Sequence, residues 1–291
     1  RYARRVMGRM PLPLSILDQS PVAHGATPQE AVAATIALAK RAEELGYHRY
    51  WLAEHHAIPN LADASPEVLL ARLTGETSRI RLGSGGIMLP HYSAFKIAEV
   101  FRMLDALAPD RIDLGVGRAP GGTRAVSAAL QSGDSALFPQ QIQEVLAYFA
   151  GAVPDPRLRG LIAQPAGSTS PAMWVLGSSD FGARLAAKFG LPYSFAQFIG
   201  GDYPQVVQAY RQLFEPSEYL DQPYAMVTLA AIVAPTDDEA DLLALPALLQ
   251  GLRRLRGIVA PFPSLAEAQT HPWTALEKSE AIAARNMILS L

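Results

Sequence analysis

Residues suited to binding a phosphate follow two separate apolar runs in the sequence. Gly177, Ser178 and Ser179 come directly after one run and lead into a predicted helix, and Arg118 comes directly after another. Backbone N–H groups at a helix N-terminus carry partial positive charge, and serine hydroxyls add further donors. A guanidinium provides the fixed cation that a phosphate monoester needs. We therefore expect these residues to bind a phosphate, the alternatives being a serine that only caps the helix and an arginine in a salt bridge at the rim.

Two adjacent histidines provide a second kind of chemistry, because imidazole exchanges protons near neutral pH. His55 and His56 follow Glu54 at the end of a third apolar run. Neighbouring side chains on an extended segment point to opposite sides, so the two rings do not readily share a metal ion, and the helical H-E-x-x-H motif is absent. We expect no metal site and one histidine facing a pocket as an acid, base or hydrogen-bond donor, with its neighbour and Glu54 structural. The alternative is a wholly structural pair.

A pair of glycines follows a further apolar run. Gly85 and Gly86 lie there, shortly before Met88. Glycine lets a backbone approach a flat ligand closely or adopt an unusual conformation, although an ordinary turn explains the pair equally well. The glycine-rich stretch 115–122 superficially resembles a dinucleotide-binding fingerprint, but its spacing is wrong and no ribose-binding acid follows in a strand about 20 residues later. A dinucleotide-binding domain is therefore not favoured.

The apolar runs before these residues alternate with segments of helical periodicity. Thr27 and Glu30 form a capping box with Pro28 at the first helical position, which predicts a helix start, and Gly46 is a typical helix terminator. The predicted strands are 14–18, 49–54, 80–84, 112–117, 173–177, 192–196 and 224–233. The predicted helices are about 28–45, 65–75, 93–107, 139–149, 180–189 and 203–214, and another begins at 236–239.

Seven strands that are each followed by a helix must pair in parallel, because crossover helices connect parallel strands. A doubly wound sheet or a (β/α)8 barrel satisfies this pattern, and the lack of a break between two domains favours an α/β protein with one (β/α)8 TIM barrel. The last β/α unit is expected to be missing from the chain, because 258–261 is too short for a strand and 287–291 is apolar up to the last residue. Active sites of such barrels lie at the C-terminal ends of the strands, where the residues above are found.

Composition excludes several classes of protein. The chain has 291 residues, of which 49% are hydrophobic and 18% charged, which provides a large core and argues against disorder. The net charge of −2 gives no general attraction to nucleic acid or to an acidic membrane, and no apolar run approaches the roughly 18 residues that cross a bilayer. The chain has no cysteine, which excludes disulfides and thiolate chemistry. We expect a cytoplasmic protein with one domain over 11–291 and a disordered, arginine-rich leader over 1–10.

Four motifs at consecutive predicted strand ends resemble the flavin-dependent bacterial luciferase-like monooxygenases. They are 51–56 (WLAEHH), 83–90 (GSGGIMLP), the helix end at 104–105 that leads to 115–121 (GVGRAPG), and 176–179 (LGSS). The resemblance covers roughly residues 14–233, with the motifs in the same order. It implies a (β/α)8 barrel that binds FMN or a deazaflavin at its mouth. The final strand and helix of the family are not visible in this sequence.

The resemblance also implies roles for individual residues. Arg118 and the Ser178–Ser179 turn would hold the flavin phosphate. Gly85–Gly86 would lie against the isoalloxazine ring, where the family often has a cis peptide. Either His55 or His56 would be the pocket histidine, and the order of residues in the family suggests His55.

The activity implied by the resemblance is the oxygenation of a small organic substrate. Reduced FMN, supplied by a separate flavin reductase because no NAD domain is visible, would react with dioxygen and transfer one oxygen atom. An apolar cavity would exclude water from this reaction. Its walls would be Trp51, Met88, Phe195 and Phe198, unless these side chains are ordinary core, and further lining is expected from loops 119–138 and 253–273.

Three alternatives to this activity follow from the same residues. One is a deazaflavin-dependent hydride transfer on the same barrel. The others are a non-catalytic flavin-binding protein and a metal-dependent barrel hydrolase. The resemblance to the family also makes a homodimer plausible, although no residue pattern specifies one.

Overall fold

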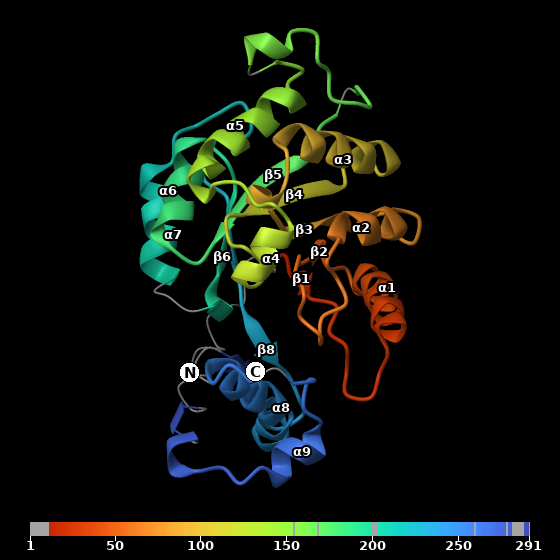
Figure 1. Ribbon diagram of the computed structural model, residues 1–291, viewed down its shortest axis with the longest axis vertical. Coiled ribbons are helices and arrows are strands. Elements are labelled where there is room, and N and C mark those ends of the chain that lie inside the picture. The colour runs from red at the N-terminus through yellow and green to blue at the C-terminus, as the bar shows by residue number, and fades with distance from the viewer. Residues whose placement is uncertain are drawn as a thin grey trace.

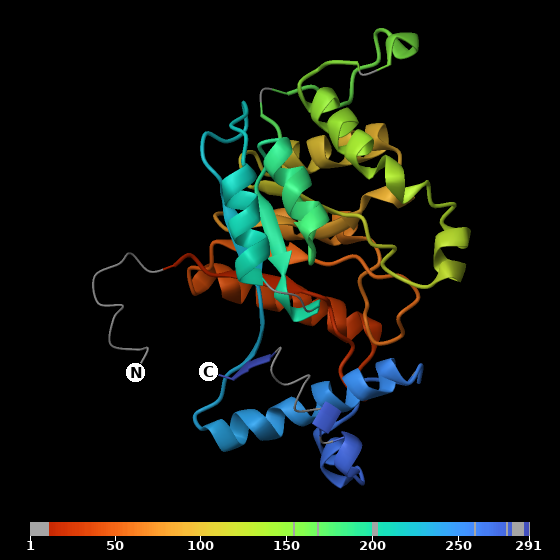
Figure 2. The same ribbon diagram turned by 90° about the vertical axis from the view of Figure 1, so that its left-hand side faces the viewer.

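The structure is a computed structural model, and Figure 1 and Figure 2 show it from two directions. The described residues are 12–153, 155–167, 169–199, 203–258, 260–277, 279–280 and 288–290. The predicted leader over 1–10 lies outside the described residues, so its disorder stays a prediction.

Seven parallel strands form one sheet in which each strand pairs with the next strand along the chain. This order is that of a (β/α)8 barrel with seven units present and closure nearly complete, which confirms the predicted fold class. No eighth strand joins this sheet in the described part of the chain. The strands are β1 (Ser15–Asp18), β2 (Arg49–Leu52), β3 (Arg81–Met88), β4 (Ile112–Gly117), β5 (Ala172–Gly177), β6 (Tyr193–Ala196) and β7 (Ala225–Thr228).

Helices lie between consecutive strands and cover the outside of the sheet (Figure 1). Thr27 begins the first helix as predicted: its hydroxyl accepts the N–H of Glu30 at 3.2 Å, and the Glu30 carboxylate accepts the N–H of Thr27 at 2.7 Å. The α-helices are α1 (Pro28–Glu44), α2 (Pro66–Thr74), α3 (Ala94–Leu107), α4 (Arg124–Ala129), α5 (Phe138–Phe149), α6 (Asp180–Lys188) and α7 (Tyr203–Leu213). The short 3-10 helices are η2 (Leu89–His91), η3 (Ser135–Leu137), η4 (Pro156–Leu158) and η5 (Gln197–Ile199).

Strand β3 is longer than predicted. It continues to Met88, so Gly85 and Gly86 lie inside the strand rather than after it. They pair with β4 through an irregular register that shifts between Gly85 and Ile87. A Cβ atom at Gly86 would lie 2.7 Å from the carbonyl oxygen of Gly115 on β4. The glycines therefore permit close strand packing, and the alternative of an ordinary turn is wrong.

The predicted strand over 224–233 divides into two. Strand β7 ends at Thr228, which pairs with Ala196, the last residue of β6. Because β6 ends there, the residues after Thr228 have no partner on that strand. The next residues form β8, which pairs in parallel with β9 in a separate two-stranded sheet. This C-terminal group lies at the bottom of Figure 1, and the predicted single domain over 11–291 stays a prediction. The group consists of β8 (Ala230–Ile232), α8 (Asp237–Leu255), α9 (Leu265–Thr270) and β9 (Ile288–Ser290).

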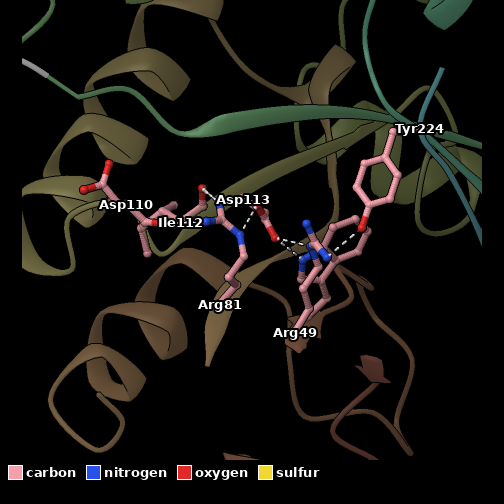
Figure 3. A network of polar contacts seen from close by, with 7 residues as sticks. Arg49, Arg81, Asp110, Ile112, Asp113 and Tyr224 are labelled. Carbon is pink, nitrogen blue, oxygen red and sulfur yellow. Dashed lines mark hydrogen bonds and ion pairs between the residues drawn. The ribbon is translucent and has the colours of Figure 1, made fainter. Parts of the chain in front are cut away.

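A buried ionic network occupies the base of the barrel, where the strands begin (Figure 3). Asp113 of β4 is fully buried and accepts hydrogen bonds from Arg49 Nε at 3.0 Å and from Arg81 Nη2 at 2.7 Å. Arg49 also lies over the ring of Trp174, 5.0 Å from its centre, in a cation–π contact. These two cations compensate the lost hydration of the carboxylate. Asp113 also accepts a hydrogen bond from Trp51 Nε1 at 3.0 Å, which fixes one edge of that ring.

Glu43 near the end of α1 secures the turn before β3, and we expect its removal to destabilise the fold in a pH-dependent way. Its Oε1 accepts the N–H groups of Ser78, Arg79 and Ile80 at 2.9, 2.6 and 3.0 Å. Burial raises the pKa of Glu43, but these N–H groups and the charge of Arg79 outweigh it and hold the pKa below its usual value. The Glu43→Ala variant should lose about 2 kcal/mol of unfolding free energy at pH 7, as measured by urea denaturation.

The sign of the pH dependence follows from the lowered pKa. The ionised carboxylate stabilises the fold above the usual pKa of a glutamate, and this contribution disappears as the pH falls through the lowered pKa. The difference between wild type and Glu43→Ala should therefore shrink on acidification. Glu44→Ala is the matched control, because Glu44 is exposed and forms an ion pair with the exposed Arg41; it should cost less than about 0.5 kcal/mol. Equal losses in the two variants would contradict the assignment.

Candidate active site

The C-terminal ends of the barrel strands surround a cavity of about 620 Å3, within the roughly 300–1,000 Å3 range of small-molecule sites. Most of the residues predicted to form the site line it, from four different strand ends. Those that line the cavity are His55, Gly85, Gly86, Met88, Arg118, Gly177, Ser178 and Ser179. His56 is not among the lining residues.

Arg118 is held beside the start of α6. Its guanidinium carbon lies 4.1 Å from the ring centre of Phe181, the second residue of that helix, in a cation–π contact. Among the described residues no carboxylate pairs with Arg118, so the alternative of a rim salt bridge is not observed. Phe181 was missed by sequence reasoning, since nothing in its local pattern indicated a partner for Arg118. The stack keeps the cation facing the cavity.

The start of α6 leaves hydrogen-bond donors for a ligand. Ser179 is the N-cap residue of α6, yet its side chain makes no capping hydrogen bond, so the alternative of a serine that only caps the helix is not observed for Ser179. The buried Tyr193 positions this turn, because its hydroxyl lies 3.2 Å from the carbonyl oxygens of both Gly177 and Ser179. Asp180 adds a negative charge at the helix start, and its ion pair with Arg184 offsets that charge. Tyr193 therefore fixes the position of the turn, and Ser179, whose hydroxyl makes no capping bond, lines the cavity.

The glycine pair forms another wall of the cavity. The Gly85–Gly86 peptide bond is cis, as the resemblance implied. A Cβ atom at Gly85 would lie 2.5 Å from Leu17 Cδ1 and 3.1 Å from Trp51 Cε3, so those side chains fill the space beneath it. A side chain at Gly85 therefore has no space on that side. The backbone forms a narrow wall with the indole of Trp51 directly behind it.

Glu54 connects the histidine segment to β3. It is fully buried and is one of the residues that line the cavity. Its Oε1 accepts hydrogen bonds from Tyr92 Oη at 2.9 Å and from His56 Nε2 at 2.6 Å, and its Oε2 accepts the N–H of Met88 at 2.9 Å. The structural role of Glu54 stays a prediction, and His56 is its direct hydrogen-bond partner.

His55 faces the cavity on the opposite side of the chain from His56. Its Nδ1 atom is buried and has no hydrogen-bond partner among the described residues. Burial lowers the pKa of His55, and the nearby charge of Glu54 only partly opposes this shift. The imidazole is therefore neutral at pH 7 and can accept a proton from a ligand in the cavity.

The apolar walls agree with the predictions except at one position. Trp51, Met88 and Phe198 line the cavity, but Phe195 is fully buried away from it and packs against Tyr193. Loop 119–138 contributes lining residues as predicted, whereas none of the described residues of 253–273 does. Lining residues that sequence reasoning did not select include Phe181 and Thr228.

The described residues also bear on the alternatives of a metal site and of a membrane protein. They contain no group of three or more histidine and acidic side chains arranged to hold a metal ion. They also contain no helix with the length and apolar character needed to span a membrane. The metal-dependent hydrolase alternative gains no support from this arrangement.

Comparison with known sequences gives one consistent result. A family model described as luciferase-like monooxygenase matches residues 10–287. The uncharacterized protein YceB of Bacillus subtilis (strain 168) is 44% identical over 270 residues, which are 91% of this chain and 82% of that protein. A luciferase-like monooxygenase of Escherichia coli (strain K12) is 38% identical over 268 residues, 91% of this chain and 79% of that protein. An N-acetyl-S-alkylcysteine monooxygenase of Bacillus subtilis (strain 168) is 44% identical over 206 residues, 69% of this chain and 61% of that protein.

Solved structures show the same fold. The structure of apo-MsnO8 is similar with a TM-score of 0.84 and 34% identity, covering 96% of this chain and 92% of that one. The oxygenating constituent of 3,6-diketocamphane monooxygenase from Pseudomonas putida, in complex with FMN, has a TM-score of 0.62 at 18% identity and covers 85% of this chain and 77% of that one. An F420-dependent secondary alcohol dehydrogenase has a TM-score of 0.64 at 15% identity, covering 93% of this chain and 84% of that one. The last two similarities concern the fold alone.

Proposed function

Because the chain belongs to the luciferase-like monooxygenase family, we propose that it is an FMN-dependent monooxygenase, which uses reduced FMN and dioxygen to oxygenate a small organic substrate. The observation that carries this proposal is the arrangement of Arg118 on Phe181 beside the free Ser179 hydroxyl. These groups provide a cation and hydrogen-bond donors for one terminal phosphate, at the wall of a cavity that also contains His55.

FMN suits this cavity better than a deazaflavin such as F420. Arg118 is the only lysine or arginine among the described lining residues. One cation matches the single terminal phosphate of FMN, whereas the tail of F420 adds several glutamate carboxylates to its phosphodiester. Those extra anions have no cationic partners among the described lining residues, so deazaflavin-dependent hydride transfer is the less favoured activity.

The residues of the chain have distinct roles in this proposal. When bound, reduced FMN supplies the electrons that activate dioxygen. Arg118, Ser178 and Ser179 bind the phosphate, and the Gly85–Gly86 backbone lies against the ring system. The imidazole of His55, which lines the cavity, accepts a proton from a group bound there. The other lining groups, Gly177 among them, shape the site, while the apolar side chains Trp51, Met88 and Phe198 exclude water.

The proposal extends to partners and location. A separate flavin reductase supplies the reduced FMN, because the glycine-rich stretch 115–122 belongs to β4 and the cavity wall instead of a dinucleotide site. We place the enzyme in the cytoplasm. We also propose a homodimer through the groove between α2 and α3, where Val68, Met103 and Leu107 are more than half exposed. Sedimentation equilibrium distinguishes the mass of a dimer from that of a single chain.

Anaerobic titration tests the cofactor. Reduced FMN, reduced riboflavin and reduced F420 are added separately while tryptophan fluorescence is followed, since Trp51 lines the cavity. We expect FMN to bind at least tenfold more tightly than riboflavin, because riboflavin lacks the phosphate. Binding of reduced F420 without binding of FMN would replace this proposal with hydride transfer.

Turnover assays then test the activity. Oxygen consumption with reduced FMN is compared with and without an aldehyde, a ketone, a sulfonate or an N-acetyl-S-alkylcysteine, the last because of the related monooxygenase described above. We expect one of these classes to yield an oxygenated product. FMN binding with no product from any class would favour a non-catalytic flavin-binding protein, and an activity abolished by a chelator would favour the hydrolase.

A further inference from the structure

His91 joins two loops at the mouth of the barrel. It ends η2, directly after β3, and its Nε2 atom lies 2.8 Å from the carbonyl oxygen of Pro120. Its Nδ1 atom lies 2.5 Å from the hydroxyl of Ser132. A carbonyl oxygen only accepts hydrogen bonds, so Nε2 donates to Pro120, and the geometry lets Nδ1 accept a hydrogen bond from the Ser132 hydroxyl. The serine thereby favours the tautomer that holds Pro120.

The loop held by His91 carries Arg118. Pro120 lies two residues after Arg118, with glycines at 117, 121 and 122 around them, so this loop has little intrinsic rigidity. The loop is also bonded to the segment after β2, because the N–H of His56 donates to the carbonyl oxygen of Gly121 at 3.0 Å. His91 therefore provides a side-chain anchor within two residues of the cation.

The anchor point is itself fixed. Gln141 of α5 donates from Nε2 to the carbonyl oxygens of Leu89, the first residue of η2, and of Tyr92, which follows η2, at 3.3 and 3.1 Å. The N–H of Gly133 donates to the carbonyl oxygen of Pro90 at 2.8 Å. The 3-10 helix is thus held from two directions, and a side chain that extends from it can fix the position of a flexible loop.

We propose that His91 is a positioning residue for the phosphate site, and that it makes the protein select a phosphorylated flavin over riboflavin. This inference rests on the proposed function. By holding Pro120, His91 fixes the backbone from which Arg118 reaches Phe181, so the cation is already in place before the ligand arrives. Without this tie, binding has to order the loop, and that entropy is lost from the affinity. A flavin without a phosphate does not contact Arg118, so its affinity should not depend on the hydrogen bond from His91 to Pro120.

The His91→Phe variant tests the proposal. Phenylalanine keeps a ring of similar size against His56 and Tyr92, whose ring centres lie 5.7 and 6.4 Å from that of His91, but it removes both hydrogen bonds. We expect the Kd for reduced FMN to rise about tenfold, and the Kd for reduced riboflavin to stay within twofold, in anaerobic fluorescence titrations. His91→Gln keeps an N–H donor for Pro120 and should restore most of the affinity.

Two further measurements separate positioning from general damage. In the Arg118→Ala background, His91→Phe should have no additional effect on FMN affinity, because the two residues act through one contact. In the protein without ligand, amide hydrogen exchange of residues 118–122 should become faster in His91→Phe. His48→Phe is the matched control, since His48 precedes β2 at the other end of the barrel. If His91→Phe does not fold, Ser132→Ala tests the same tie through the tautomer and should weaken FMN binding about threefold, again without affecting riboflavin.

The outcomes distinguish this inference from the proposed function. Equal weakening of FMN and riboflavin binding in His91→Phe would mean that His91 is only structural. If His91→Phe changed neither Kd, the inference would be overturned while the FMN site stayed intact. If the wild-type protein binds neither flavin, the proposed function fails and the role of His91 fails with it.

Discussion

Replacing Arg118 with alanine is expected to raise the Kd for reduced FMN by about 10- to 100-fold. Hydrogen bonds to a charged group are worth about 1.5–3 kcal/mol, and each 1.4 kcal/mol changes a Kd about tenfold. Arg118 is the only cation among the described lining residues, so no neighbour replaces it. The Kd for reduced riboflavin should stay within twofold of the wild-type value, because that ligand has no phosphate for the guanidinium to bind.

Two variants make this experiment specific. Arg118→Lys keeps the charge but loses the planar fork and the flat stack on Phe181, so it should recover only part of the affinity. Arg211→Ala removes an exposed arginine of α7 and should change neither Kd. Wild-type FMN affinity in Arg118→Ala would show that the phosphate is bound elsewhere, and the role of Ser178 and Ser179 would then need the same test.

The meeting of Arg118 with the Ser178–Ser179 turn was predictable from sequence order alone. Both follow apolar runs that alternate with helices, and parallel strands bring their C-terminal ends to one face of a barrel. Neighbouring strands along the chain also pair, so residues about 60 positions apart come within one cavity. This inference needed only the positions of the strands, which local patterns indicate well.

The position of Phe195 shows where such reasoning failed and how it could have succeeded. Side chains alternate between the two faces of a strand. Ser194 and Ala196 of β6 line the cavity, so Phe195 must point outward into the packing against Tyr193, whereas Phe198 lies beyond the strand in η5. The same alternation separates His55 from His56. Strict use of the two-residue alternation along β6 would have excluded Phe195 from the residues predicted to line the cavity.

Other features were beyond the sequence for a different reason. The stack of Phe181 on Arg118 and the bond from His91 to Pro120 join residues from separate strand–helix units. Their geometry depends on how far each loop rises above the barrel, which no local pattern encodes. Similarly, the sequence left an ordinary turn open as an alternative for Gly85 and Gly86, and only the close approach of Gly115 and Leu17 shows that a strand continues there.

Replacing His55 with alanine is expected to lower the rate of substrate oxygenation by about 100-fold or more while the Kd for reduced FMN stays within threefold. General acid–base catalysis contributes about 10²–10⁴-fold to a rate. His55 lines the cavity, whereas His56 does not line it and its ring is hydrogen-bonded to Glu54. His56→Ala should therefore lower the free energy of unfolding. At saturating flavin it should lower the rate much less than His55→Ala does. His24→Ala, an exposed histidine of the loop after β1, is the control and should leave both unchanged.

The pH dependence gives the same prediction a second readout. Burial lowers the pKa of His55, so the ring is neutral at pH 7 and becomes protonated only as the pH falls through that lowered value. Since only the neutral ring accepts a proton, the wild-type rate should fall on acidification, and the rate of His55→Ala should lack this step. A low-pH step of unchanged position in His55→Ala would assign the titration to another group. If His56→Ala removed the step and His55→Ala kept it, the proton acceptor would be His56, and the orientation of the two rings would not determine their roles.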